Sequence, residues 1–388
     1  MDAPTRVMKA LNHEEPDRVP AYEAFTNNAI MNHYGIPTSK GSSKTIKALT
    51  YLPFKDRIAG WVVSNKNFFV KGYTDSYEFL RRVKIDVGIC LFTHFQRKII
   101  KGGIIDEFGR IIKFETYEED GTVISAYHGG YFKSFEEYES WERPDPQDPK
   151  RLASYHAGKE VQGLMNNEVL AVPTISGLLE PSWEAFGIER FSRLLARPKH
   201  AKKVFDDSGK LAVELTKILG DEGTELIMVL DDYGFKNGPF MSPKNFQTYV
   251  FPWLKRICDE AHKRGTKILL HSDGDLMLLF DDIVNCGIDA INPIEPSTAN
   301  PEYDIFKLNE RYGDKITFVG NISPIMLAEG SIQEIEDYSK KLIQELAPGG
   351  GYIFASGHSI PPTVTVDRWE AVMRMREKYG TYPIQTSS

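Results

Sequence analysis

The chain has 388 residues, of which 41% are hydrophobic and 26% are charged, and its formal net charge is −7. This is ordinary globular composition, and an α/β barrel of this length forms one domain. The chain has no basic block or stripe, so nucleic-acid binding gets no support, and no apolar run approaches the ~18 residues of a membrane span.

The three cysteines, Cys90, Cys258 and Cys286, are widely separated and form no CxxC or CxH pattern. Disulfides are therefore not expected, which fits a reducing cytosol, and we interpret the cysteines as buried apolar side chains. The N-terminal residues Met1–Arg6 lack the apolar core of a signal peptide. Together these features predict a cytoplasmic protein.

Eight short runs along the chain have the composition of β-strands. Several are nearly unbroken apolar runs, as strands buried on both faces require. In chain order the runs are Arg18–Glu23, Lys84–Phe92, Val169–Ser176, Glu225–Asp231, Lys267–His271, Ala290–Ile294, Lys315–Gly320 and Gly351–Ser356.

Amphipathic helical stretches lie between most of these runs. Ser242–Arg264 carries apolar residues at helical spacing and ends before Gly265. Ser331–Leu346 begins with a capping box, because Glu334 follows Ser331 by three residues. About eight repeats of strand and helix predict a (β/α)8 TIM barrel of the α/β class. The alternative is an open doubly wound sheet, although no GxGxxG motif follows the first strand.

Two regions interrupt this alternation, and we expect them to be insertions, at about 26–82 and 102–132, in a single barrel domain spanning 1–388. The first is a long excursion after the first strand, and the second predicts a β-hairpin after the second strand. Each could be a lid over the barrel mouth or a packing decoration. The excursion is rich in aromatic residues: Tyr34, Tyr51, Phe54, Trp61, Phe68 and Phe69. The hairpin comprises Ile104–Phe108, Arg110–Tyr117, an Asp-Gly turn at Glu118–Gly121, and Thr122–Tyr127.

In a barrel, function gathers at the C-terminal ends of the strands. Polar residues stand at most of the predicted ends, so the sequence predicts a ligand-binding mouth. The candidate substrate-binding residues are Glu23, Trp183, Asp231 and Asn321. Two of them also have a structural interpretation. Asp231 could brace neighbouring backbone, and Asn321 could satisfy the hydrogen-bonding groups of the backbone in a turn.

The segment Lys267–Asp275 contains the candidate metal ligands His271 and Asp273. Residues two apart on a strand point to the same face, so both side chains can aim at one spot. With His358 they make two histidines and one carboxylate, which suits zinc with an open position or a non-haem iron. There are two alternatives for the cluster: it could bind a proton instead of a metal, or it could have a purely structural role. His358 could also be a loop histidine without a part in the site.

These segments carry a family resemblance. The matching motifs are Pro16–Pro20, Asp231–Gly234 with Ser242–Pro243, Leu270–Gly274, Gly320–Ile322, Gly349–Ile353 and Gly357–Pro361. Over nearly its whole length the chain resembles the uroporphyrinogen decarboxylase superfamily. That resemblance implies a (β/α)8 barrel.

Departures from the family patterns distinguish its branches. The decarboxylases carry an arginine-rich N-terminal motif that grips porphyrin carboxylates, and Val19–Thr26 contains no arginine. The thiol-directed cobamide methyltransferases hold zinc through His-x-Cys and a later Cys, where this chain has Asp273 and, near the later position, His358. The resemblance therefore favours the corrinoid-dependent methyltransferases that demethylate methoxylated aromatics.

This branch implies transfer of a methyl group from a small donor, an aryl methyl ether (O-demethylation), to the cobalt of a separate corrinoid protein. The cobamide (cobalamin-type) cofactor belongs to the partner, because the chain has no DxHxxG segment. The resemblance implies zinc or another divalent metal at His271, Asp273 and His358. Candidate catalytic residues that could supply a proton are Glu180, Asp232 and Tyr233.

Three alternatives stay open at this point. The chain could be a decarboxylase-like lyase acting on a carboxylated tetrapyrrole through Asp231 or Asp232, or a methylcobamide:thiol methyltransferase. It could also bind a small ligand or a corrinoid partner without turnover. The sequence leaves a homodimer open.

Overall fold

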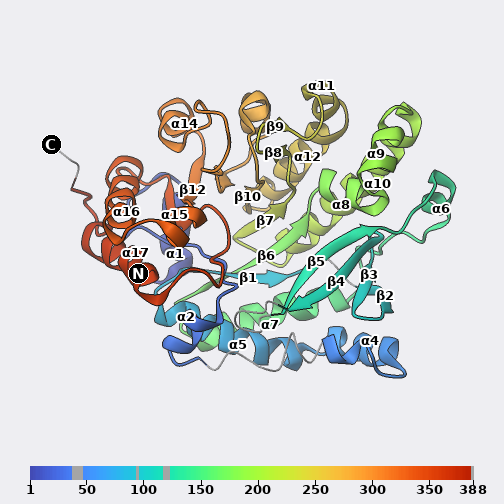
Figure 1. Ribbon diagram of the computed structural model, residues 1–388, viewed down its shortest axis with the longest axis horizontal. Coiled ribbons are helices and arrows are strands. Elements are labelled where there is room, and N and C mark those ends of the chain that lie inside the picture. Colours follow the sequence, from blue (N-terminus) through green and yellow to red (C-terminus); the bar gives the residue numbers. More distant parts are fainter. Residues whose placement is uncertain (37–46, 93–95, 117–122, 386–388) are drawn as a thin grey trace.

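A computed structural model describes residues 1–36, 47–92, 96–116 and 123–385. Within these ranges, a curled sheet of seven parallel strands forms the centre of the molecule, in the order β1-β6-β7-β10-β11-β12-β13 (Figure 1). The strands are β1 (Val87–Leu91), β6 (Leu170–Ser176), β7 (Leu226–Leu230), β10 (Lys267–His271), β11 (Ala290–Asn292), β12 (Thr317–Ile322) and β13 (Tyr352–Ser356).

The predicted first strand closes the ring of strands. Ala21 pairs with Phe354 of β13, and Tyr22 pairs with Val87 of β1, both in parallel. The pairing with β1 and β13 consists of isolated bridges, partly because Pro20 has no N–H to donate, although its carbonyl accepts from Phe354. The predicted (β/α)8 barrel is thus confirmed, with a first strand that is shorter than the predicted Arg18–Glu23.

The inside of the barrel is filled and closed at its N-terminal end. Apolar side chains from all seven strands form the inner cluster, to which helix α1 (Ala3–Leu11) adds Val7, Ala10 and Leu11. The backbone N–H of Gly351 also donates to the carbonyl of Ala10. Because α1 covers this end, the opposite end, where the strands finish, is the mouth.

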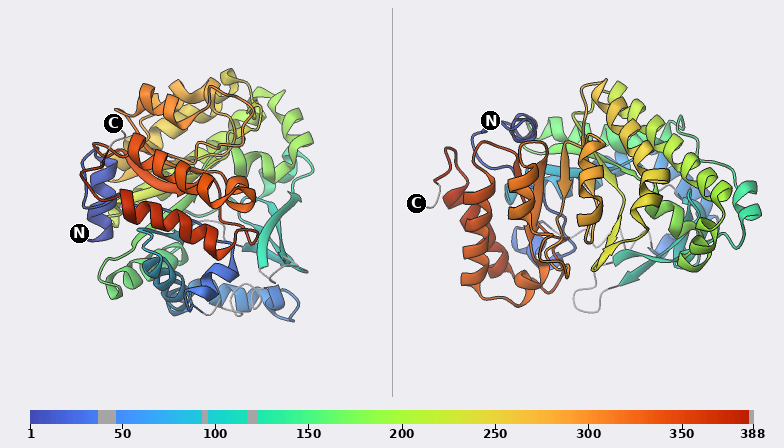
Figure 2. Two further views of the ribbon diagram at one scale, coloured as in Figure 1. Left: turned by 60° about the vertical axis from the view of Figure 1, so that its left-hand side comes forward. Right: turned by 90° about the horizontal axis from the view of Figure 1, so that it is seen from above.

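Helices pack on the outside of the strands, and a second apolar cluster fills the layer between them. The predicted helix Ser331–Leu346 is present as α16 (Ile332–Leu346) with its capping box. Figure 2 shows α16 beside α17 near the chain ends. The other helices of this layer are α7 (Lys150–Leu164), α10 (Pro198–Asp221), α12 (Phe251–His262), α13 (Phe280–Asn285), α14 (Ile305–Tyr312) and α17 (Val366–Tyr379).

The predicted continuous helix Ser242–Arg264 is broken in the structure. It divides into α11 (Pro243–Asn245), a π-helical turn at Phe246–Val250, and α12. Pro252 stands in the first turn of α12. A proline cannot donate to the carbonyl four residues earlier and its ring displaces that carbonyl, so a regular α-helix cannot run through this position.

Both predicted insertions contain regular structure. The hairpin is present as β4 and β5, and two further strands extend it to an antiparallel sheet in the order β2-β3-β4-β5. The predicted Glu118–Gly121 turn lies outside the described residues. The strands are β2 (Gln96–Ile100), β3 (Gly103–Asp106), β4 (Arg110–Thr116) and β5 (Val123–Gly130), and the described helices of the first insertion are α2 (Asn28–His33), α4 (Lys55–Ser64) and α5 (Lys66–Arg82).

Short elements complete the fold. They are α6 (Phe135–Ser140), α8 (Leu179–Phe186), α9 (Ile188–Leu195), α15 (Pro324–Glu329), a 3-10 turn at Met277–Leu279, and the ribbon of β8 (Gly234–Phe235) and β9 (Gly238–Pro239). Of the helices in the described ranges, each is too short or too polar to cross a lipid bilayer.

One buried carboxylate joins the two ends of the chain to the predicted first strand, the segment that contains Ala21. Asp86, which is fully buried, accepts hydrogen bonds from the guanidinium groups of Arg6, Arg18 and Arg376 at 2.7–3.0 Å. It also accepts from the backbone N–H of Ala21 at 2.8 Å. These contacts hold the first strand in the gap between β1 and β13.

We expect Asp86→Asn to lower the free energy of unfolding by about 3 kcal/mol or more, because it removes the carboxylate that pairs with the buried guanidinium of Arg376 and one of the two that pair with Arg6. Urea denaturation followed by tryptophan fluorescence measures the loss. Glu189→Gln is the control, since Glu189 pairs with Arg193 on the surface and both side chains are about three-quarters exposed. Equal stability of Asp86→Asn and wild type would contradict this account.

Candidate active site

The barrel mouth holds a cavity of about 210 Å³. Its walls come from the first strand, from the ends of β7, β10, β11 and β13, and from the loop after β13. The lining residues are Tyr22, Glu23, Ala24, Leu230, His271, Asn292, Ser356, His358 and Ser359. None of these described residues carries a basic Lys or Arg side chain, and none comes from the aromatic excursion 26–82.

The structure brings three potential metal ligands together beside this cavity. One ligand atom each from Asp232, His271 and Asp273 lies within 4.8 Å of the others, and all three side chains are half-buried. His271 and Asp273 were predicted as ligands, whereas Asp232 was predicted as a proton donor. His358 Nε2 lies 3.9 Å from Asp273 Oδ2, and its side chain is 61% exposed, so it stands at the edge of the group.

A backbone contact orients Asp232. The backbone N–H of Asp273 donates to Asp232 Oδ1 at 2.9 Å, which holds the Asp232 carboxylate beside Asp273. Gly274 has a φ of +89°, and a Cβ there would lie 2.2 Å from the backbone of Gly234. A side chain at Gly274 would therefore force apart the two loops that carry Asp232 and Asp273.

The residues of this group fit a divalent cation. Asp273 Oδ1 is buried and has no hydrogen-bond partner among the described residues. Burial, with Asp232 nearby, raises the pKa of Asp273 to about 6, although His271 and His358 oppose the shift. Carboxylates and an imidazole are common ligands for zinc and related ions.

Asp231 braces the start of α8. Its fully buried carboxylate accepts the backbone N–H groups of Leu178, Leu179 and Glu180 at 2.7–3.1 Å. Burial raises its pKa to about 6, and these hydrogen bonds oppose the shift. Gly177 leaves the space that this carboxylate occupies, since a Cβ there would lie 2.3 Å from it. The geometry matches the bracing interpretation of Asp231, since its oxygens contact backbone and the residue is not among those that line the mouth cavity.

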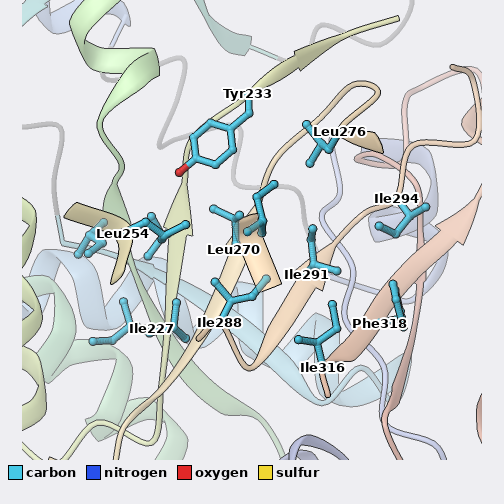
Figure 3. Close-up of a cluster of buried hydrophobic side chains, with 14 of the residues drawn as sticks. Ile227, Tyr233, Leu254, Leu270, Leu276, Ile288, Ile291, Ile294, Ile316 and Phe318 are labelled. Carbon is cyan, nitrogen blue, oxygen red and sulfur yellow. The ribbon is translucent and has the colours of Figure 1, made fainter. Parts of the chain in front are cut away.

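Tyr233, predicted as a proton donor, lies in the outer core. Its side chain is fully buried among apolar residues such as Ile227, Leu254 and Leu270 (Figure 3). Burial, with the Asp231 carboxyl beside it, holds the pKa of the phenol well above its usual value. Tyr233 continues the outward-facing set of Ile227 and Val229 along β7, and it is not among the residues that line the mouth cavity, so the phenol does not reach the cavity.

Glu180 belongs to a buried ionic cluster next to the mouth. Arg110 Nη1 lies 3.6 Å from Glu180 and 3.1 Å from Glu184, while its Nε donates to Asp106 at 2.6 Å. Burial and the neighbouring Glu184 hold the pKa of Glu180 well above its usual value. Sequence reasoning missed Arg110 and Glu184, although two glutamates four residues apart on one helix signal the need for a cation.

Glu23 lies in the cavity wall within a hydrogen-bonded chain. Its Oε2 accepts the N–H of Ser356 at 3.0 Å, and its Oε1 lies 2.6 Å from the Ser356 hydroxyl. That hydroxyl also contacts the carbonyl oxygen of His358, which can only accept. A serine has one hydroxyl hydrogen, so both contacts are satisfied together only when Glu23 is protonated and donates to Ser356. Burial accordingly raises the pKa of Glu23 to about 8.

The two remaining predicted substrate-binding residues have different surroundings. Asn321 is buried, donates to the carbonyl of Ile294 and accepts from the hydroxyl of Tyr338, both at 2.8 Å. It therefore joins β12 to the segment after β11 and to α16. Trp183 is half-buried on α8 and belongs to an aromatic array, in which neighbouring ring centroids are 4.9–5.3 Å apart. The members of the array are Tyr127, Trp183, Phe240 and Phe235.

The Glu23 proton makes stability depend on pH. The folded protein holds this proton up to about pH 8, whereas the unfolded chain releases it above its ordinary pKa of 4.5. Stability should therefore fall as pH rises through this window, by up to about 1.4 kcal/mol per pH unit from this group.

Urea denaturation between about pH 5 and about pH 8 tests this, because Glu23→Gln removes the titrating group and should flatten the decline. Glu302→Gln, at a two-thirds exposed side chain, is the control and should follow wild type. Parallel pH profiles for wild type and Glu23→Gln would refute the assignment of the proton to Glu23.

Comparisons with known proteins identify the family. The family model described as uroporphyrinogen decarboxylase (URO-D) matches residues 131–379. The uroporphyrinogen decarboxylase of Schizosaccharomyces pombe is 28% identical over 171 residues, which covers 41% of this chain and 44% of that protein. The decarboxylase of Colwellia psychrerythraea is 28% identical over 167 residues, covering 40% of this chain and 43% of the relative. The chain thus matches less than half the length of these relatives.

A solved structure shares the fold over its full length. A methyltransferase from Methanosarcina mazei aligns with a TM-score of 0.67, at 16% identity, covering 98% of this chain and 99% of that one. At this identity the likeness concerns the fold. Because the family match covers well over half of the chain, the protein belongs to the uroporphyrinogen decarboxylase family.

Proposed function

We propose that this protein is a methyltransferase that moves a methyl group from a small donor, a methoxylated aromatic, to the cobalt of a separate corrinoid protein. The observation that carries the proposal is the mouth itself. Carboxylates and histidines gather there in a metal-binding pattern, and its described lining contains no Lys or Arg. We also propose that 1–388 form one barrel domain that includes both insertions.

The charge of the mouth argues against a polycarboxylate substrate. A tetrapyrrole with many carboxylates needs cationic partners, whereas this mouth presents the carboxylates Asp232 and Asp273 and a protonated, uncharged Glu23. Arg110 is nearby, but it is engaged by Asp106, Glu184 and Glu180. A neutral aryl ether makes no such demand.

His271, Asp273 and Asp232 would hold the divalent cation, with His358 at the edge of the group. A cation bound there would polarise the ether oxygen as a Lewis acid. This chain's own residues supply the proton. When the methyl group leaves, negative charge develops on the phenolic oxygen, and Glu180 is the group we assign to protonate it, because burial and Glu184 raise its pKa and so favour its acid form.

The aromatic array supports an aryl donor. Phe235 belongs to the β8 segment, and the neighbouring Gly234 N–H donates to the carbonyl of Asp273 at 3.2 Å. The array therefore begins beside the candidate metal group. Phe235 is 52% exposed and stacks on Phe240. An aryl ring stacked at its open end would have its ether group near the mouth.

The proposal predicts methyl transfer by the purified protein. Mixed with a methoxylated aromatic and a reduced corrinoid protein, it should generate methylated corrinoid, followed by absorbance. His271→Ala should lower the rate by at least about 100-fold. His262→Ala is the control, since His262 pairs with Asp289 on the helical layer. No transfer across a panel of methoxyarenes would sink the proposal.

The aromatic array predicts a defect specific to substrate binding. Phe235→Ala should raise KM for methoxyarenes by about 3- to 10-fold, the equivalent of one lost aromatic contact, with a smaller effect on kcat. Phe54→Ala removes a more exposed ring, 81% accessible, from the excursion and should change neither constant. Unchanged KM in Phe235→Ala would remove the array from the binding site.

Family membership favours a second candidate, decarboxylation of a carboxylated tetrapyrrole. In that reaction Asp232 would be the charged group beside a pyrrole, since Asp231 is held by backbone. A direct assay with uroporphyrinogen separates the two: carboxyl loss without methyl transfer would replace the first proposal by the second. A methylcobamide:thiol methyltransferase is a third assignment, which transfer to a thiol in the same corrinoid assay would reveal.

A further inference from the structure

His271 is held by a chain of side chains that crosses three adjacent strands. Its Nδ1 lies 2.6 Å from Oδ1 of Asn292, the residue paired with it on β11. Asn292 Nδ2 donates in turn to the carbonyl of Val319 on β12 at 2.9 Å. Both His271 and Asn292 line the mouth cavity, and Asn292 is 3% exposed.

The chemistry of these groups leaves one arrangement of hydrogens. A backbone carbonyl only accepts, so the Asn292 atom facing Val319 is the amide nitrogen. The other amide atom, Oδ1, then faces His271 and can only accept. His271 Nδ1 must therefore carry the hydrogen, and in the neutral imidazole Nε2 carries the lone pair.

We propose that Asn292 is a positioning residue that fixes this tautomer of His271, so that Nε2 is the nitrogen presented to a divalent cation held with Asp273 and Asp232. The cation rests on the proposed function, while the tautomer does not. Histidine ligands commonly donate their second ring N–H to an oxygen acceptor, which sets ring orientation and raises ligand basicity. Here the acceptor is an amide anchored to the next strand.

Equilibrium metal binding tests the positioning role. Metal-free protein would be titrated with Zn²⁺ or Co²⁺ against a chromophoric chelator. Asn292→Leu keeps the volume and removes the acceptor, so it should weaken affinity about 10- to 100-fold. Because Leu keeps the volume, a purely steric role predicts no loss in that variant. Asn292→Asp keeps an acceptor oxygen but removes the amide donor, so it should restore most of the affinity if the acceptor positions His271.

Asn321 provides a matched control on the neighbouring strand. It is also 3% exposed, and its amide also donates to a backbone carbonyl, but its oxygen accepts from Tyr338 instead of a histidine. Asn321→Leu should therefore leave the metal affinity unchanged. Circular dichroism and thermal unfolding of each variant show whether the fold is retained.

A spectroscopic signature tests the tautomer without metal. Nitrogen-15 shifts of His271 in the metal-free protein, at a pH where the ring is neutral, should show hydrogen on Nδ1. In Asn292→Leu the population should move toward hydrogen on Nε2, the form usually preferred by a free imidazole ring. A wild-type His271 with its hydrogen on Nε2 would overturn the proposal even if the variant failed to fold.

The outcomes separate this inference from the proposed function. Equal metal affinity in wild type and Asn292→Leu would overturn the positioning role, even in a protein that transfers methyl groups. Failure of wild type to bind either ion would overturn it as well. If metal binding depends on Asn292 but no methoxyarene is demethylated, the positioning role stands and the proposed function falls.

Discussion

Asp86 joins the start of the chain, its last helix and the predicted first strand, which contains Ala21. A lone buried carboxylate would be strongly destabilising, so its three guanidinium partners are needed to keep it charged in the interior. Arg6 comes from α1, Arg18 from the segment before Ala21, and Arg376 from α17. The predicted first strand, which fills the gap between β13 and β1, makes few backbone pairings. The ion pairs of Asp86 therefore help to hold it in place.

The mouth depends on that closure. The Asp86 carboxylate binds the N–H of Ala21, and the two residues that follow, Tyr22 and Glu23, line the cavity. The hydrogen-bonded chain from Glu23 through Ser356 to the carbonyl of His358 then connects the first strand to the loop after the last one. Displacing the first strand would therefore disturb the loop that carries His358.

Carboxylates are concentrated at this end of the barrel, and the structure compensates most of them in distinct ways. Asp231 accepts hydrogen bonds from backbone N–H groups, and Arg110 pairs with Glu180 and Glu184. Glu23 is neutralised by a proton that it donates to Ser356. Asp232 and Asp273 face each other beside His271, and one Asp273 oxygen is buried without a partner in the described part of the chain. A bound cation relieves this kind of repulsion and lowers the carboxylate pKa.

The sequence by itself determined the order of strands and helices and the segments that supply the mouth, because buried parallel strands need continuous apolar runs and barrels carry polar residues at their ends. His271 and Asp273 could be paired in advance because strand periodicity is local. Only the tertiary structure decided the contacts across strands: Asp232 beside His271, Asn292 behind it, and Arg110 from a separate sheet. It also placed Tyr233 in the outer core with Ile227 and Val229, because a strand that is apolar on both faces does not reveal from its sequence which alternate set of side chains points inward.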